Sequence, residues 1–176
     1  NSFNAEPVCL IFNAFVIQKD VKNDNSINYV VFSDTVDTGI KGFGNTLQAF
    51  EHHLKQYGGV FAGISSFSAF LPPVGKKGVA YPASKAFMDM AIRCLRLVFP
   101  KNVKFVTIHL GNLVSDDKKE SPGKSYKKAA KKIVRSLLKK RIKKEINFPF
   151  SYTMMYKYVF RFIPSFLYVR LMKMLG

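Results

Sequence analysis

Short apolar runs alternate with longer stretches of helical periodicity along the first part of the chain. The runs are Pro7–Phe12, Gly59–Ser65 and Val103–His109. Continuous apolar runs of this length are typical of strands buried on both faces of a parallel sheet. The helices predicted between them cover Thr35–Tyr57 and Ala80–Val98. This alternation predicts an α/β fold, a doubly wound parallel sheet with helices on both faces.

Polar or glycine-containing segments follow the predicted strands. They are Asn13, Ser65-Ser66 and Leu110-Gly111-Asn112. Ligands of parallel α/β sheets bind beyond the carboxyl ends of the strands. These three segments are therefore the expected location of a ligand.

The last part of the chain has a different character. Ser125–Arg141 predicts an amphipathic helix with Ser125 as its N-cap and a lysine-rich outer face. After Pro149 the sequence becomes aromatic and basic. Pro164 interrupts it, and Ser165–Leu175 predicts a final helix with Arg170 and Lys173 opposite an apolar face.

Composition limits the class of protein. The chain has 176 residues, suiting one domain, and 48% hydrophobic residues, enough for a core. No secretory signal and no uninterrupted apolar run of ~20 residues is visible. Cys9 and Cys94 lie in apolar stretches and are expected to be buried free thiols, which favours a cytoplasmic location. His52 and His53 are adjacent and diverge on a helix, so no metal site is expected.

The net charge is +17, and ten lysines and arginines fall between Lys127 and Lys144. Nucleic acid, an anionic membrane surface and simple solubility are the three explanations. Nucleic acid is disfavoured because no stacking platform or nucleic-acid motif accompanies the charge. The basic helix and the aromatic, basic end resemble a surface that lies on anionic lipid. The alternative is that Lys127–Lys144 forms a solvated face and that the last helix packs near the substrate loop or against a partner subunit.

Tyr81 and Lys85 are the main candidates for chemistry. A spacing of four places both side chains on one face of a helix, one turn apart. A free tyrosine has a pKa of about 10, and an ammonium within ~4–6 Å favours the phenolate. A tyrosine tuned in this way can act as general acid/base on an alcohol or a carbonyl.

The segment Gly63–Lys85 resembles the active-site region of the short-chain dehydrogenase/reductase family. A buried strand ends in Ser65-Ser66, and Tyr81-Pro-Ala-Ser-Lys85 is similar to the YxASK form of the family motif. The resemblance implies Ser66, Tyr81 and Lys85 as catalytic residues. The serine-to-tyrosine spacing is two residues longer than the common one, so Ser68 is the alternative serine.

Further matches extend the resemblance from Pro7 to about Phe150. Leu10–Ala14 is similar to the strand that ends in NNAG, with Phe12 and Phe15 replacing its first asparagine and its glycine, and Leu110–Ser115 is similar to PGxVxT. The resemblance implies a Rossmann-like fold and NAD or NADP as cofactor. It assigns cofactor contacts to Asn13, Tyr81, Lys85, Gly111, Leu113 and Ser115.

Two departures qualify the resemblance. Gly39 stands where the family has an asparagine that helps hold a water linking the lysine to solvent. Nothing in the chain matches the family's N-terminal TGxxxGxG turn, and the first strand corresponds to the family's fourth, so the N-terminal strands are expected to be missing. Gly39–Gly44 is rich in glycine but follows no predicted strand, so it does not predict a phosphate loop.

The sequence thus predicts an NAD(P)-dependent oxidoreductase that interconverts an alcohol and a carbonyl, with Tyr81 as general acid/base. The alternative is a non-catalytic binding protein, or a truncated fragment, on the same fold. Residues 1–150 are expected to form a partial Rossmann-like domain, and residues 151–176 a basic, aromatic extension. The expected partners are a small carbonyl or alcohol substrate, for which the apolar C-terminal region suggests a hydrophobic character, and, by family resemblance, a second copy of the chain.

Overall fold

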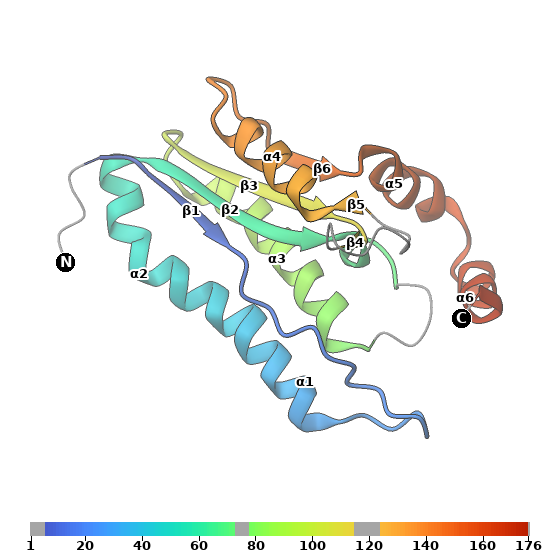
Figure 1. Cartoon of the computed structure of the whole chain (residues 1–176). Helices are drawn as coiled ribbons and strands as arrows, with labels where there is room; N and C mark the ends of the chain where they lie inside the picture. The colour runs from blue at the N-terminus through green and yellow to red at the C-terminus, as the bar shows by residue number, and fades with distance from the viewer. Residues whose placement is uncertain (1–5, 73–77, 115–123, 176) are drawn as a thin grey trace.

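Four parallel strands form the centre of the computed structural model, which describes residues 6–72, 78–114 and 124–175. Their order is β1-β2-β3-β6 (Figure 1). The strands are β1 (Val8–Phe12), β2 (Gly59–Ser66), β3 (Val103–Leu110) and β6 (Glu145–Phe148). Within this sheet, the first three agree with the predicted runs to within one residue at each end. The predicted α/β fold with a parallel sheet is confirmed.

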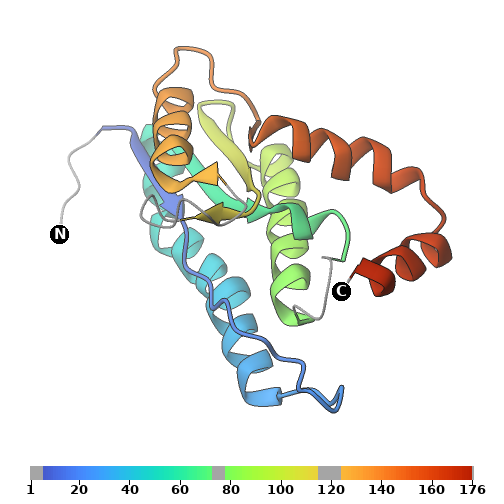
Figure 2. The same cartoon turned by 45° about the vertical axis from the view of Figure 1, so that its right-hand side comes forward.

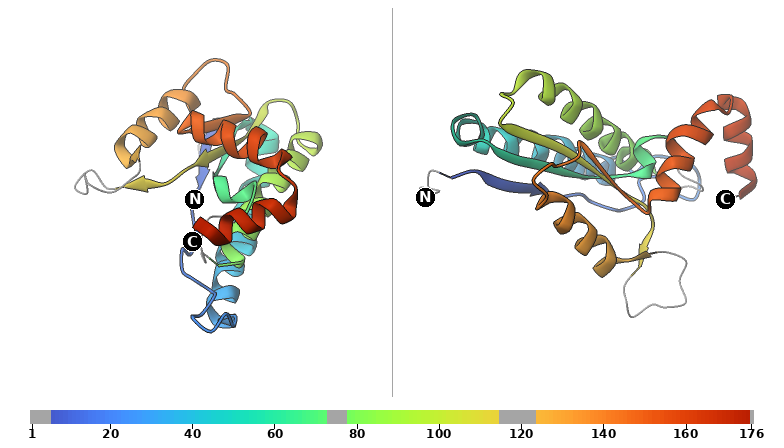
Figure 3. Two further views of the ribbon diagram at one scale, coloured as in Figure 1. Left: turned by 90° about the vertical axis from the view of Figure 1, so that its right-hand side faces the viewer. Right: turned by 90° about the horizontal axis from the view of Figure 1, so that it is seen from above.

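Helices cover both faces of this sheet (Figure 3). α2 (Gly42–Tyr57) and α3 (Ala80–Val98) lie on one face, where aromatic and aliphatic side chains form a core. α4 (Tyr126–Leu137) lies on the other face and packs Ile133 and Leu137 against β2, β3 and β6. Ser125 caps α4 as predicted, since its hydroxyl accepts a bond from the Lys128 amide at 3.4 Å. The predicted end at Arg141 was too late, because Leu138 is the C-cap.

The first long helix begins earlier than its sequence pattern predicts. α1 (Tyr29–Val36) is capped by Asn28 and continues through the π-helical turn η1 (Asp37–Lys41) into α2. The predicted start at Thr35 was wrong, because the extra residue in the π turn shifts the helical phase and breaks the apolar period. Gly39 lies in this turn, so Gly39–Gly44 is helical, as predicted, and forms no phosphate loop.

The chain after β6 was only partly predicted. α5 (Phe150–Met154), the π turn η3 (Met155–Val159) and the short η4 (Phe160–Phe162) lead to α6 (Ser165–Leu175) beside the carboxyl end of the sheet (Figure 2). α6 agrees with the prediction. Two very short strands, β4 (Leu113–Val114) and β5 (Lys124–Ser125), pair outside the main sheet.

The prediction that the cysteines are buried was wrong. Cys9 and Cys94 are both exposed free thiols. In β1 the alternate residues Val8, Leu10 and Phe12 pack towards α2 and α3, which turns Cys9 to the opposite face. The core contacts of α4 there are with β2, β3 and β6, so Cys9 remains uncovered.

Candidate active site at the carboxyl ends of the strands

Ser66 and Tyr81 meet at the end of β2. Ser66 is the last residue of that strand, and Tyr81 is the second residue of α3. The Ser66 hydroxyl accepts a 3.2 Å hydrogen bond from the Ser68 amide, and the same side chain lies near enough to the Tyr81 hydroxyl to lower its pKa. The Ser68 hydroxyl is buried and has no hydrogen-bond partner among the described residues. Of the two candidate serines, the geometry therefore favours Ser66.

The protonation of Tyr81 follows from its surroundings. Burial raises the pKa of Tyr81, and the polar Ser66 side chain partly offsets this rise because it stabilises the phenolate. Lys85 Nζ lies 5.5 Å from the centre of the tyrosine ring. The sequence predicted that Lys85 lowers the pKa of Tyr81. In this structure the Lys85 amine instead donates to the carbonyl of Ile64, and burial raises the pKa of Tyr81.

The Lys85 ammonium is enclosed on the inner side of α3. Its Nζ donates a 2.5 Å hydrogen bond to the carbonyl of Ile64 and lies 3.2 Å from the centre of the Phe15 ring. Only 3% of Lys85 is exposed. Burial lowers the pKa of Lys85 to about 7, although the nearby Asp89 carboxylate acts in the opposite direction. The amine is therefore partly neutral at physiological pH.

Phe15 and Gly39 form a matched pair beside this lysine. A Cβ added to Gly39 would lie 2.6 Å from Phe15 Cε1 and 3.2 Å from Ser84 Cβ. The Phe15 ring also makes edge contacts with Phe12 and Tyr81. The space beside Gly39 is thus filled by the phenylalanine ring. Both residues depart from the family pattern noted above, and the structure shows that the two departures are in contact.

Asp20 holds the start of the helix that carries Tyr81. Its two carboxylate oxygens accept 2.8 Å hydrogen bonds from the amides of Val79 and Ala80. Gly78 has φ +101°, and a Cβ there would lie against the Asp20 carboxylate. Asp20 therefore caps α3 from a loop sixty residues earlier in the chain. Sequence reasoning missed this role, because no local spacing connects the two segments.

A second buried polar pair adjoins Lys85. His109 Nε2 lies 2.7 Å from Asp89 Oδ2, and His109 Nδ1 lies 2.9 Å from Asn147 Oδ1. The histidine is 1% exposed, and Asp89 is 5% exposed. Asp89 follows Lys85 by one turn, so one helical face carries Tyr81, Lys85 and Asp89 in succession. That spacing was the signal in the sequence that could have identified Asp89.

The remaining candidates lie at the neighbouring strand ends. Asn13 directly follows β1 and is exposed. The Gly111 amide donates a 2.9 Å hydrogen bond to the carbonyl of Phe148, and a Cβ at Gly111 would clash with the Phe67 ring. Leu113 is half-buried in β4. Ser115 lies outside the described residues. The strand ends thus bring Ser66, Tyr81 and Gly111 to one edge, as the parallel register requires.

No protein-family model matches this sequence, and no curated protein matches it. Solved structures do match. A serine dehydrogenase in complex with NADP+ gives a TM-score of 0.68 at 16% identity over 79% of this chain and 63% of its own. A short-chain dehydrogenase/reductase from Vibrio parahaemolyticus gives 0.65 at 17% identity over 82% and 67%. A 7beta-hydroxysteroid dehydrogenase gives 0.67 at 14% identity over 95% and 66%.

The present chain spans about 63% to 67% of the length of these three structures. At identities of 14% to 17% the similarity establishes the fold and leaves the activity to be argued from the site. The described part of the chain therefore has the Rossmann-like α/β fold of short-chain dehydrogenases and reductases.

Proposed function

We propose that this chain supplies the Ser66, Tyr81 and Lys85 centre of an oxidoreductase that interconverts an alcohol and a carbonyl. The observation that carries the proposal is that Ser66, at the end of β2, acts on the Tyr81 hydroxyl closely enough to lower its pKa, with Lys85 one helical turn further along α3. Two hydroxyls that converge at a strand end can bind one substrate oxygen from two directions. This geometry suits proton transfer to or from that oxygen.

Each residue has a distinct role in the proposal. Tyr81 donates its phenolic proton to the developing alkoxide during reduction and accepts it during oxidation. Ser66 stabilises charge on the same oxygen through a hydrogen bond. Lys85, with a pKa of about 7, can exchange a proton near neutral pH and restore the protonation state of the tyrosine. The Asp89 carboxylate favours the protonated form of Lys85 by electrostatic attraction.

NAD or NADP is the hydride carrier in this proposal. The exposed Asn13 offers a polar side chain at the sheet edge, and the half-buried Leu113 offers an apolar one. The Gly111 amide is bonded to the Phe148 carbonyl, so in this proposal the Gly111 turn contacts the cofactor through other backbone groups. Unlike these residues, Lys85 is not accessible to the cofactor in this structure. Its amine is covered by Phe15, so a ribose hydroxyl can reach it only when that ring turns aside. Phe15 lies in the loop after β1 and is only half-buried, and the proposal requires its ring to change rotamer when the cofactor binds.

The test begins with Tyr81→Phe, which removes the hydroxyl and keeps the ring. Oxidation of NADPH and NADH is followed with a panel of ketones, and turnover should fall by about 10²- to 10⁴-fold. Tyr29→Phe is the matched control, because Tyr29 is 75% exposed on α1. Turnover that survives Tyr81→Phe unchanged would refute the assigned role.

A non-catalytic binding protein is the second candidate, and the Phe15 ring over Lys85 favours it. The two candidates differ in dinucleotide binding. The oxidoreductase should quench or shift NADPH fluorescence, and Phe15→Ala should tighten binding because it uncovers Lys85. If neither the native protein nor Phe15→Ala binds NADPH or NADH, the non-catalytic candidate replaces the first.

A further inference from the structure

The outer face of α6 carries large apolar side chains in the open. Phe166 is 71% exposed, Val169 46% and Met174 78%, and Phe162 just before the helix is 82% exposed. At 3.6 residues per turn, Phe166, Val169 and Met174 are spread over roughly 140° of the circumference of α6, which is less than half of it. Side chains of this size are isolated on most soluble surfaces, whereas here they form a continuous stripe.

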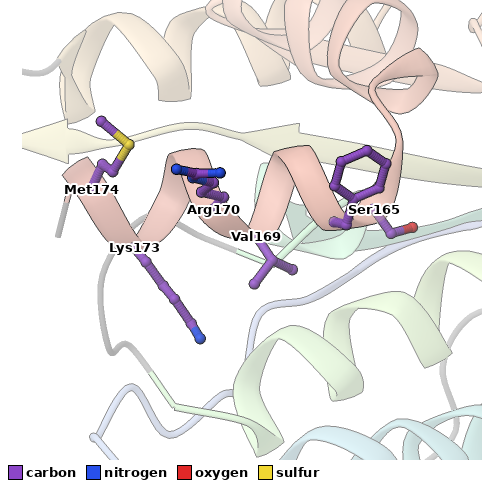
Figure 4. A pocket seen from close by; sticks show the side chains of 6 residues that line it. Ser165, Val169, Arg170, Lys173 and Met174 are labelled. Carbon is purple, nitrogen blue, oxygen red and sulfur yellow. The ribbon is translucent and has the colours of Figure 1, made fainter.

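Two cations lie within this stripe. Arg170 and Lys173 line, with Ser165, Phe166, Val169 and Met174, a shallow hollow of about 570 Å³ on α6 (Figure 4). From Ile146 to the C-terminus the sequence contains four lysines and arginines and no aspartate or glutamate. The surface therefore combines apolar side chains with positive charge that no acidic residue of this segment offsets.

Tyr168 determines which side of α6 faces solvent. Tyr168 is 3% exposed, and its hydroxyl donates a 2.6 Å hydrogen bond to the carbonyl of Pro72. The Tyr168 ring also contacts Phe160. Because Tyr168 lies on the side of the helix away from Phe166 and Arg170, this anchor holds the apolar, basic stripe towards solvent.

The combination of apolar side chains and positive charge on this stripe indicates the kind of partner that it binds. No helix among the described residues is long and apolar enough to cross a membrane. A second copy of the chain would bring Arg170 and Lys173 of its own against the same charges, in a protein whose net charge is +17. A bilayer that contains anionic lipid offers an apolar layer for Phe166 and Met174 and negative head groups for the two cations.

We propose that the outer face of α6 docks on the surface of an anionic lipid bilayer. The stripe lies in the interface, with Phe162, Phe166 and Met174 buried among the acyl chains near the head groups. Arg170 and Lys173 pair with lipid phosphates. The membrane would then lie beside the carboxyl edge of the sheet, since α6 is tied to the segment that follows η2 (Phe67–Ala69).

Co-sedimentation of the full chain with vesicles tests the proposal. Vesicles of phosphatidylcholine alone are compared with vesicles of equal parts phosphatidylcholine and phosphatidylglycerol. We expect binding to the anionic vesicles only. Arg170→Gln with Lys173→Gln should weaken it by about 30-fold, and Phe166→Ala with Met174→Ala by about tenfold or more. Circular dichroism confirms that each variant is folded.

Two matched controls keep the test specific. Lys131→Gln with Lys132→Gln removes two exposed charges from α4, and Leu97→Ala removes a side chain of α3 that is 87% exposed. Both should leave vesicle binding near the native level. Equal binding to the two kinds of vesicle, no binding to either, or an equal loss in the α4 variant would overturn the proposal. So would self-association in the absence of lipid that Phe166→Ala abolishes, because the stripe would then be an interface between copies.

Discussion

Replacement of Gly39 by alanine tests how the Phe15 ring is placed. The added Cβ would lie 2.6 Å and 3.0 Å from two Phe15 ring carbons and 3.2 Å from Ser84 Cβ. Overpacking of this kind costs about 1–3 kcal/mol, whereas glycine to alanine inside a helix otherwise gains roughly 0.5–1 kcal/mol. We therefore expect Gly39→Ala to lower the free energy of unfolding by about 1–2 kcal/mol, measured by urea denaturation.

The same substitution should behave differently once the ring is removed. In a Phe15→Ala background the main clash disappears, so Gly39→Ala should cost little or become stabilising. The double-mutant cycle should give a coupling energy of about 2 kcal/mol. Gly44→Ala is the control on the same helix, because its Cβ would meet nothing within 4 Å. If Gly39→Ala and Gly44→Ala change stability equally, Phe15 does not occupy the space beside Gly39, and the argument that it covers Lys85 fails with it.

Three further predictions concern the elements around the site. Asp20→Ala should lower the free energy of unfolding by about 2–4 kcal/mol in thermal or urea melts, because the Val79 and Ala80 amides at the start of α3 lose a charged acceptor. Asp24→Ala is the control, because it removes only exposed hydrogen bonds to Ser26 within the same loop. Lys85 binds its proton with a pKa of about 7 in the folded chain and 10.5 in the unfolded one, so stability should rise with pH between these values by up to about 1.4 kcal/mol per unit. That rise should vanish in Lys85→Met; a Lys85→Met protein with the native pH profile would contradict it. Asp89→Asn should lower the Lys85 pKa further, which NMR titration of the labelled lysine would detect, and an unchanged or raised value would show that Asp89 does not act on Lys85.

Local pattern was sufficient for much of the fold. β1, β2 and β3 are apolar runs, α3 begins and ends at the predicted residues, and α6 follows Pro164 as its period requires. Such elements can be predicted because burial imposes a period of two or 3.6 on neighbouring residues. The same reasoning placed Tyr81 and Lys85 on one helical face, since their spacing is a property of the helix alone. β6 was missed because it is a short strand after a dense basic stretch.

The surroundings of Tyr81 and Lys85 depend on contacts between distant parts of the chain. The Phe15 ring on Lys85, the Asp20 cap on α3 and the Asp89–His109 pair each join segments that are far apart in the chain or are not related by a helical or strand period. Which side of α6 is covered likewise depends on Tyr168 reaching Pro72, not on the helix itself. Local sequence pattern was enough to predict β1, β2, β3, α3 and α6 and the positions of Tyr81 and Lys85 along α3. The packing of loops and distant side chains determined the burial, and burial set the pKa of Lys85, because desolvation depends on every neighbour and not on position in the chain.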